Sequence, residues 1–478
     1  MSVDLNLRPT LSLLGSEGIT RLHGGAVQIL AETGLNVHHP DMRQKLADAG
    51  ARLGDDVRVY LSEEMVTSAI QSASKNVVIH DRLGKPVMPL GPHQMCFGTG
   101  SDLVNTRDAE TLERRSSRSS DVSNAARLCD ALEDIDFVMS FGLPADVPAP
   151  DIEPRQFYDM IANTTKPALM TSYSGLDTLQ RMHDMACLVA GGDDAFRARP
   201  NYVMYGQFVS PLQHDLMAVE RLIFCADHDV PLIYIPTIMP GASGPVTLAG
   251  SFALAVAESL AGLVMHQTQR PGAPFIFGAC VSQLDMRTML YPYGSPEWRL
   301  NDLAMAELSR HYGLPVFGTG GSTDSKTTDA QTGAESALGI LAAVLAGTNL
   351  IHDVGYLESG LTGSLESIVL GAEHARWARH YIEGFDISAE TLALDVIHQV
   401  GPGKQFLDQD HTIRHLRSRM WHPYVSDRDG FDAWESAGSK DYAARARDFA
   451  LDLLKSHEPD ALAPGIDKDL RRLANVDG

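Results

Sequence analysis

The chain is poor in cysteine and has no long hydrophobic run. Its five cysteines are scattered among 478 residues and form no C-x-x-C pair, which argues against a disulfide framework and favours a reduced interior. The N-terminal segment has no basic stretch followed by an apolar core, so no signal peptide is predicted. The longest apolar run, at about 334–345, is too short to span a bilayer. We therefore expect a soluble, cytoplasmic protein.

Basic and aromatic residues are also scarce. Lys and Arg number 39 against 61 Asp and Glu, so the formal net charge is −22. Because binding to phosphates needs a basic face, neither nucleic acid nor an anionic membrane is expected as a partner. Aromatic residues make up only 7% of the chain, so a local concentration of them carries information.

Eight short apolar segments recur along the chain, and seven of them run into glycine, aromatic or polar residues. A stretch with helical character separates each segment from the next. Eight strand–helix repeats close a parallel barrel, whose active site lies at the carboxyl ends of the strands. The predicted strands are 95–100, 137–142, 168–173, 202–207, 232–237, 275–280, 315–320 and 349–355.

An open, doubly wound sheet also alternates strand and helix and is the alternative fold. Two observations favour an α/β fold of the (β/α)8 TIM barrel type: the repeats are similar in size, and polar or aromatic residues end several strands. We place this catalytic barrel at 91–384. An N-terminal α/β extension at 1–90 includes a helix over 14–32 with Ser16 as N-cap, and a C-terminal helical extension covers 385–478.

Two glycine pairs suggest a nucleotide site, but neither completes its motif. The pair in 98–100 is followed by Leu103 where a third glycine is needed, and the pair in 318–320 is followed by Thr323. The segment 401–404 (GPGK) matches only the end of a P-loop. We expect the strand-end glycines to allow tight turns or a close approach of the backbone to a ligand.

His411 and His415 are four residues apart on one face of a predicted helix, a spacing that can hold a metal ion. No glutamate stands between them as in H-E-x-x-H, and histidines in such a setting more often cap a helix or pair with nearby acids. No metal site is therefore predicted.

The end of the eighth strand concentrates reactive side chains. His352 and Asp353 lie in the predicted strand, and Tyr356 and Glu358 follow it. Because this end faces the barrel mouth, His352, Asp353 and Glu358 are the predicted catalytic residues. The alternative for Asp353 is that it only binds the amides of its loop.

Aromatic residues gather at or near the predicted strand ends. Rings around a pocket favour a cation, above all a quaternary ammonium, which cannot donate hydrogen bonds. A single ring more often belongs to the barrel core, so the set is more informative than its members. The set is Phe97, Phe141, Tyr173, Tyr205, Phe208, Tyr234, Phe277, Phe317 and Tyr356. The predicted substrate-binding residues are Phe97, Tyr173, Tyr205, Gln207, Phe277, Phe317, Lys326 and Tyr356.

Three segments carry more specific patterns. They read TDxK-x-x-D-x-Q-x-G, NLIxDxGxLExG and G-x-G-x-x-FL-x-x-x-HT, and lie within 320–337, 346–367 and 401–425. On these patterns the chain resembles the trimethylamine methyltransferase superfamily over nearly its whole length. The resemblance implies a barrel, in agreement with the strand count, and a methyltransferase activity.

The founding members of that superfamily carry pyrrolysine, whereas this chain contains only standard residues. It therefore resembles the non-pyrrolysine branch, whose members demethylate quaternary amines, and glycine betaine is the first substrate expected. The resemblance implies that a Co(I) corrinoid (cobalamin) on a separate protein accepts the methyl group, with no cofactor bound tightly here. A methyl group on a quaternary nitrogen leaves behind a neutral amine, so its transfer needs orientation more than acid catalysis.

The group that holds a substrate carboxylate stays open. The candidates are His352, Gln207, Lys326, Arg287 and the backbone amides near Gly98 and Gly320. Four residues match the family pattern and either contact substrate or brace the loop after the seventh strand. They are Asp324, Lys326, Asp329 and Gln331.

Two other functions fit the same barrel. In a lyase, Lys326 would serve as a Schiff-base amine; in a sensor, the aromatic cage would bind a betaine without catalysis. Barrels of this size often pair, so a homo-oligomer is expected.

Overall fold

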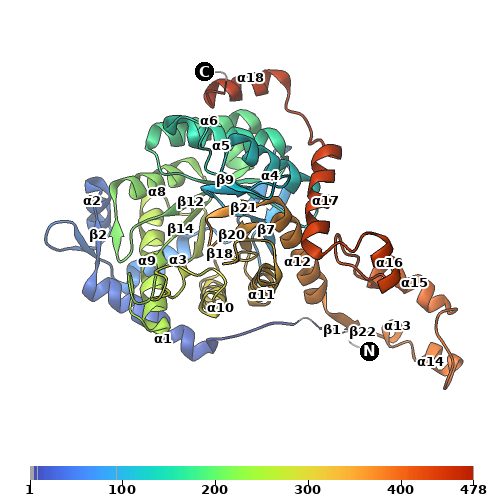
Figure 1. Ribbon diagram of the computed structural model, residues 1–478. Coiled ribbons are helices and arrows are strands. Elements are labelled where there is room, and N and C mark those ends of the chain that lie inside the picture. The colour runs from blue at the N-terminus through green and yellow to red at the C-terminus, as the bar shows by residue number, and fades with distance from the viewer. Residues whose placement is uncertain (1–4, 8, 93, 477–478) are drawn as a thin grey trace.

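Eight parallel strands form a closed barrel at the centre of the protein (Figure 1). The computed structural model describes residues 5–7, 9–92 and 94–476. The strands pair in the order β10–β11–β12–β14–β16–β18–β19–β7, and a bridge between Gly98 and Phe137 closes the ring. The predicted TIM barrel is confirmed, and the open sheet is wrong. The strands are β7 (Cys96–Thr99), β10 (Val138–Met139), β11 (Ala168–Thr171), β12 (Tyr202–Gln207), β14 (Leu232–Ile235), β16 (Phe275–Gly278), β18 (Val316–Thr319) and β19 (Leu350–Val354).

Side chains along each strand alternate between the barrel interior and the surrounding helices, as the period of two requires. Leu169 and Val203, which are directly paired in β11 and β12, belong to the interior cluster. Their neighbours Met170 and Met204 join the larger cluster under the helices. Both faces of the sheet are buried, which explains why the strands read as nearly continuous apolar segments.

Nine helices surround this barrel in the described part of the chain. Four of them begin with a polar N-cap side chain, Asp215, Ser295, Asp329 or Ser364, that accepts a backbone N–H of the first turn. The helices are α4 (Ser119–Ala131), α5 (Ile152–Asn163), α6 (Leu176–Ala190), α7 (Asp193–Ala198), α8 (Leu216–His228), α9 (Leu248–Gln269), α10 (Pro296–Tyr312), α11 (Ala330–Ala346) and α12 (Leu365–Glu383).

The expectation that the longest apolar run lies at about 334–345 is wrong, because the 22 residues of α9 are long and apolar enough to span a membrane by length and composition. In this fold 78% of its apolar window is buried inside the protein. The helix packs against α8 of the barrel and against α1, α2 and α3 of the N-terminal extension. Its composition therefore reflects a central helix covered on several sides.

The N-terminal extension wraps the outside of α9 and closes the bottom of the barrel. Ile79 and Met88, on two paired strands, are buried with the interior residues of the barrel. The amide of His80 donates to the carbonyl of Pro200, just before β12, so this hairpin lies at the amino ends of the strands. The elements are β1 (Leu5–Leu7), α1 (Gly15–Gln28), a π-helix (Ile29–Thr33), β2 (Leu35–Val37), α2 (Pro40–Asp48), β3 (Arg52–Leu53), β4 (Arg58–Tyr60), α3 (Glu63–Ser72), β5 (Val78–His80) and β6 (Pro86–Pro89).

A carboxylate from the barrel caps the first helix. The predicted cap, Ser16, is wrong: Leu14 holds the N-cap position of α1 and its side chain makes no capping bond. The carboxylate of Glu307 on α10 instead accepts the amides of Leu13, Leu14 and Gly15. A side chain distant in sequence thus satisfies amides that no local side chain reaches.

Short strands and one 3-10 helix build the loops around the carboxyl ends of the barrel. Strands from the loops after β7 and β19 join in one four-stranded sheet, in the order β20–β21–β8–β9. The loop elements are β8 (Asn105–Arg107), β9 (Arg114–Ser116), a 3-10 helix (Ala149–Asp151), β13 (Gln213–His214), β15 (Thr237–Ile238), β17 (Cys280–Val281), β20 (Tyr356–Leu357) and β21 (Thr362–Ser364).

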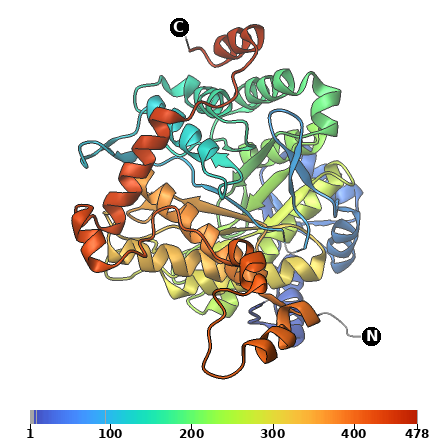
Figure 2. The same ribbon diagram turned by 90° about the vertical axis from the view of Figure 1, so that its right-hand side faces the viewer.

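The C-terminal extension is helical and partly leaves the barrel. Helix α17 packs against α12 and α4, and α18 packs against α6 and α5 (Figure 2). Helices α13 and α14 project from the barrel at the lower right of Figure 1, where β22 pairs with β1. The elements are β22 (Phe385–Ile387), α13 (Ala389–Leu392), α14 (Leu394–Val400), α15 (Asp410–Arg419), α16 (Phe431–Ser436), α17 (Tyr442–Ser456) and α18 (Pro464–Leu473).

Replacing Glu307 should loosen the N-terminal extension. We expect Glu307→Ala to lower the free energy of unfolding by about 1–2 kcal/mol, because the amides that begin α1 lose their acceptor. Hydrogen exchange should accelerate in residues 13–20. The matched control is Glu435→Ala on the exposed surface of α16.

The effect should depend on pH. Burial raises the pKa of Glu307, but the three amides outweigh it and hold the pKa below its usual value. A lowered pKa stabilises the fold above the unfolded pKa, and this stabilisation is lost as the pH falls through the folded value. Equal stability of variant and wild type at neutral pH would contradict the capping role.

Candidate active site at the barrel mouth

His352 and Asp353 meet at the carboxyl end of β19. Nδ1 of His352 donates to the carbonyl oxygen of Gly318, at 2.9 Å, which leaves Nε2 as the unprotonated nitrogen of the neutral ring. Nε2 lies 3.0 Å from Oδ1 of Asp353. Burial lowers the pKa of His352 to about 4, so the imidazole is neutral at physiological pH.

The backbone bends where these two residues occur. The register of β19 against β7 shifts between Ile351 and Val354, and Asp353 has a φ of 79°. Consecutive residues of a regular strand point to opposite faces, whereas this irregularity brings His352 and Asp353 into contact. Asp353 is one of the residue types that tolerate the left-handed region.

The carboxylate of Asp353 is buried and has no hydrogen-bond partner among the described residues. Its contact with His352 is close but lacks the alignment of a hydrogen bond. Burial raises the pKa of Asp353 well above its usual value; the charge of Arg299 opposes this shift and that of Asp302 adds to it. The alternative, that Asp353 binds loop amides, is therefore wrong.

Two predicted aromatic residues line the barrel beside this pair. The ring of Phe317 lies 4.2 Å from the ring of His352 and 5.2 Å from that of Tyr205, between centroids. The amide of Gln207 donates to the Tyr205 hydroxyl at 2.6 Å and to Thr237 at 2.9 Å. Gln207 itself is exposed at the end of β12, so it forms the rim of the mouth.

The sequence analysis missed three aromatic residues that complete this wall. Tyr291 and Tyr293 lie in the loop after β17, and Trp298 lies in the first turn of α10. The Tyr293 and Trp298 rings are 4.3 Å apart, and the Tyr291 ring is 4.9 Å from Trp298. The Tyr291 hydroxyl and the Trp298 indole N–H are buried without a partner in the described chain. The run YPYGSPEW could have pointed to them.

Four tyrosines of the mouth lie close enough to Asp353 for its charge to affect their pKa values. Burial raises the pKa of four tyrosines at the mouth, and negative charge on Asp353 raises each pKa further. They are Tyr205, Tyr291, Tyr293 and Tyr356. An acidic group therefore stands within an aromatic wall contributed by several loops.

Tyr356 explains one of the glycine pairs. Its hydroxyl accepts the amide of Ser101 and donates to the carbonyl of the same residue, both at 2.6 Å. A Cβ on Gly100 would lie 2.1 Å from the Tyr356 ring, and one on Gly98 would lie 2.1 Å from the Phe137 ring. These glycines therefore make room for aromatic rings next to the backbone, and not for the phosphate of a nucleotide.

Tyr173 lies at the outer edge of the mouth. It is 57% exposed, and its hydroxyl donates to the carboxylate of Asp102. Asp102 also accepts from Ser140 at 2.8 Å and from Gln156 at 3.1 Å. Asp102 follows β7 and was not singled out in the sequence, because a lone acid after a strand carries no pattern.

Two predicted cage residues do not lie at the mouth. Phe97 faces the helices, where the Arg379 guanidinium lies 4.9 Å from its ring centroid. Phe277 packs edge-on against Tyr312 of α10, with 5.4 Å between centroids. Both residues stand at strand positions whose side chains point outward to the helices, so their assignment to the cage is wrong.

Glu358 does not join the predicted catalytic group. Its carboxylate forms an ion pair of 2.7 Å with Arg114 of β9 and accepts from Thr362 of β21. It therefore fastens the sheet of loop strands above the barrel.

The family-pattern residues after β18 act mainly as braces. Asp324 accepts the amides of Tyr293 and Gly294, at 2.8 and 3.0 Å, and so ties the aromatic loop to its own. Asp329 caps α11. Gln331 donates to Glu335 at 2.8 Å.

Lys326 is exposed, and its ammonium group donates to the Asp324 carbonyl at 2.8 Å. Schiff-base lysines are activated by a desolvated or strongly cationic setting. An exposed amine of this kind does not favour the lyase alternative.

The geometry suits a small cation. A buried carboxylate supplies charge, and aromatic faces supply attraction without requiring a hydrogen-bond donor from the ligand. The neutral His352 can accept a proton at Nε2, but it adds no positive charge to the site.

The chain is similar to known proteins over nearly its whole length. Residues 3–475 match the family model described as trimethylamine methyltransferase (MTTB). The chain is similar to the trimethylamine methyltransferase MttB of Desulfitobacterium hafniense, with 32% identity over 97% of this chain and 93% of that protein. It is also similar to a glycine betaine methyltransferase of the same species, with 31% identity over 97% of both chains.

A solved structure supports the fold. The monomethylamine methyltransferase MtmB of Methanosarcina barkeri matches 93% of this chain and 88% of its own, with a TM-score of 0.54 at 11% identity. At that identity the likeness concerns the architecture alone. Taken with the family match over nearly the whole length, the chain belongs to the trimethylamine methyltransferase family and is an enzyme of the methyltransferase type.

Proposed function

We propose that this protein transfers a methyl group from a quaternary amine, with glycine betaine as the first substrate, to the Co(I) corrinoid (cobalamin) of a separate protein. The observation that carries the proposal is the buried Asp353 carboxylate, which has no hydrogen-bond donor among the described residues and touches His352, itself packed against the rings of Phe317 and Tyr205. A quaternary ammonium has no N–H to donate. Charge and ring faces are therefore the two contacts it can use.

The chemistry needs orientation more than proton transfer. As the methyl carbon forms its bond to cobalt, its bond to nitrogen breaks, and the electron pair of that bond stays on nitrogen. The leaving group is a neutral tertiary amine, so no acid must protonate it. The positive charge that Asp353 attracts is lost with the methyl group, which favours release of the product.

Quaternary amines are favoured over tertiary ones by two facts. The chain contains only standard residues, and a relative similar over its whole length is named a glycine betaine methyltransferase.

A betaine carboxylate needs its own partner at the rim. Lys326 and Arg287 are exposed cations on the loops after β18 and β17, and Gln207 is an exposed amide at the end of β12. We assign the carboxylate to this rim, opposite the acidic interior. In the same proposal the corrinoid domain docks over the mouth, because the methyl group must point out of the barrel.

The reaction can be tested directly. Purified protein is mixed with reduced cob(I)alamin and, separately, with glycine betaine, proline betaine, carnitine, choline or trimethylamine. We expect methylcobalamin to form with a betaine and not with trimethylamine, as read from the absorbance spectrum. Conversion of trimethylamine alone would contradict the quaternary assignment, and binding of a betaine without conversion, even with a corrinoid protein present, would favour the sensor.

Asp353→Asn should weaken cation binding while stabilising the fold. We expect at least about tenfold weaker binding of glycine betaine by calorimetry, since the negative charge is lost. Because burial raises the pKa of Asp353, wild type loses stability as the pH rises above the unfolded pKa, and the variant does not. The variant should therefore gain about 1–2 kcal/mol at neutral pH. The control is Asp395→Asn on α14. Equal binding of glycine betaine by both variants would show that Asp353 does not contact the cation.

The aromatic wall can be tested at Tyr293. Tyr293→Leu should weaken glycine betaine binding by about 1–2 kcal/mol, whereas Tyr293→Phe, which keeps the ring face, should change it little. The surface variant Tyr381→Ala on α12 serves as control, since Tyr381 is 54% exposed. In 3,3-dimethylbutanoate carbon replaces the quaternary nitrogen, so the trimethyl end has the same shape but no charge, and this isostere should bind wild type weakly. Equal affinity for betaine and isostere would exclude a cation site.

A further inference from the structure

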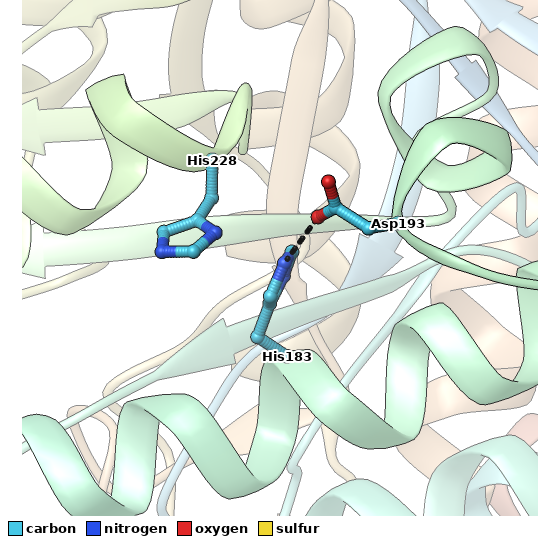
Figure 3. Close-up of side chains that lie close together, drawn as sticks. All are labelled: His183, Asp193 and His228. Atoms are coloured by element: carbon cyan, nitrogen blue, oxygen red, sulfur yellow. Dashed lines mark ion pairs between the residues drawn. The ribbon is translucent and has the colours of Figure 1, made fainter.

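A second cluster of ligating side chains lies outside the barrel, remote from the mouth. His183 comes from the middle of α6, Asp193 begins α7 and His228 ends α8. Figure 3 shows the three side chains converging from three separate helices. One ligand atom from each lies within 4.8 Å of the other two.

The distances approach those of a metal site. Nε2 of His183 lies 3.5 Å from Oδ1 of Asp193. Two ligand atoms bound tetrahedrally at about 2.1 Å from zinc are separated by about 3.4 Å. The rings of His183 and His228 have centroids 4.6 Å apart, so their nitrogens reach the same space.

Two of the three ligand groups are oriented by a neighbour. The Tyr202 hydroxyl lies 3.4 Å from Nδ1 of His183, and this contact turns Nε2 toward the cluster. Arg197 donates to Oδ2 of Asp193 at 2.8 Å, which leaves Oδ1 facing His183. Contacts of this kind around metal ligands fix ring orientation and raise affinity.

His228 supplies an independent indication. Its Nδ1 is buried and has no hydrogen-bond partner in the described chain. In Figure 3 a ring nitrogen of His228 is turned toward the other two residues. A buried imidazole nitrogen without a partner is destabilising, and a metal bond would offset that cost. The ring itself stacks on Phe224, 4.3 Å away between centroids.

Solvent reaches the cluster through Asp193. Its side chain is 52% exposed, which gives an ion a path from solvent.

We propose that His183, Asp193 and His228 bind one divalent transition-metal ion, with Zn²⁺ as the best fit, and that water occupies the fourth position. Two imidazoles and one carboxylate form a donor set that zinc accepts, whereas magnesium and calcium prefer oxygen alone. The thiol of Cys187 lies 3.4 Å from the same nitrogen, Nε2 of His183. The ion would join α6, α7 and α8 on the outer wall of the barrel.

The sequence predicts no metal here because the ligands come from three elements without a local motif.

The test uses the full chain, stripped with a chelator and titrated with Zn²⁺ against a chromophoric competitor. Wild type should bind one tight equivalent and unfold at a higher temperature with zinc. His228→Ala and Asp193→Asn should each weaken binding at least about 100-fold and abolish the thermal shift. Asp193→Asn keeps the shape of a half-exposed side chain, so its result does not depend on a packing defect.

The matched control is the other histidine cluster. His411 and His415 are half-buried and lie with the exposed Glu390 on the C-terminal extension. His411→Ala should leave the tight equivalent unchanged. Loss of zinc binding in His411→Ala but not in His228→Ala, or no zinc binding by wild type, would overturn the proposal. If the zinc-free protein still transfers methyl groups, the proposed function does not depend on the metal site, and the two proposals can be judged independently.

Discussion

A carboxyl group buried without a hydrogen-bond donor in the described part of the chain is the constraint around which the barrel mouth is built. Asp353 occupies a bend in β19, beside a histidine whose free nitrogen can only accept. In the absence of a ligand the fold bears the cost of that arrangement, since a buried acid is destabilised when it ionises. A cation removes the cost, and the surrounding rings select one that cannot donate hydrogen bonds. The folding free energy that is lost by burying Asp353 is thus recovered when a cation binds.

The loops are arranged to keep that environment fixed. Asp324 joins the loop that carries Tyr293 to the loop after β18, and Glu358 fastens the sheet above the mouth through Arg114. From the sequence Glu358 is a predicted catalytic residue, and Asp324 either contacts substrate or braces the loop after the seventh strand. Their hydrogen bonds are instead satisfied by neighbouring loops, which distinguishes them from Asp353.

The barrel and its eight strands could be predicted because apolar segments buried on both faces leave a strong periodic signal. His352 and Asp353 followed from their place at the end of a strand. Phe97 and Phe277 could not be placed, since a shift of one position reverses the face of a strand residue. Tyr291, Tyr293 and Trp298 reach the site from a loop, where no period indicates direction. The cluster of His183, Asp193 and His228 depends on contacts between separate helices and left no pattern at all.

The most direct test of the cation site is the proton balance of binding. Glycine betaine is titrated calorimetrically into wild type and Asp353→Asn across a range of acidic pH, in buffers of different ionisation heat. Wild type should release close to one proton and bind more tightly as the pH rises, because the cation displaces the proton from Asp353. The variant should release none. Binding to wild type without proton release, and with affinity independent of pH, would contradict the assignment of Asp353 as the partner of the cation.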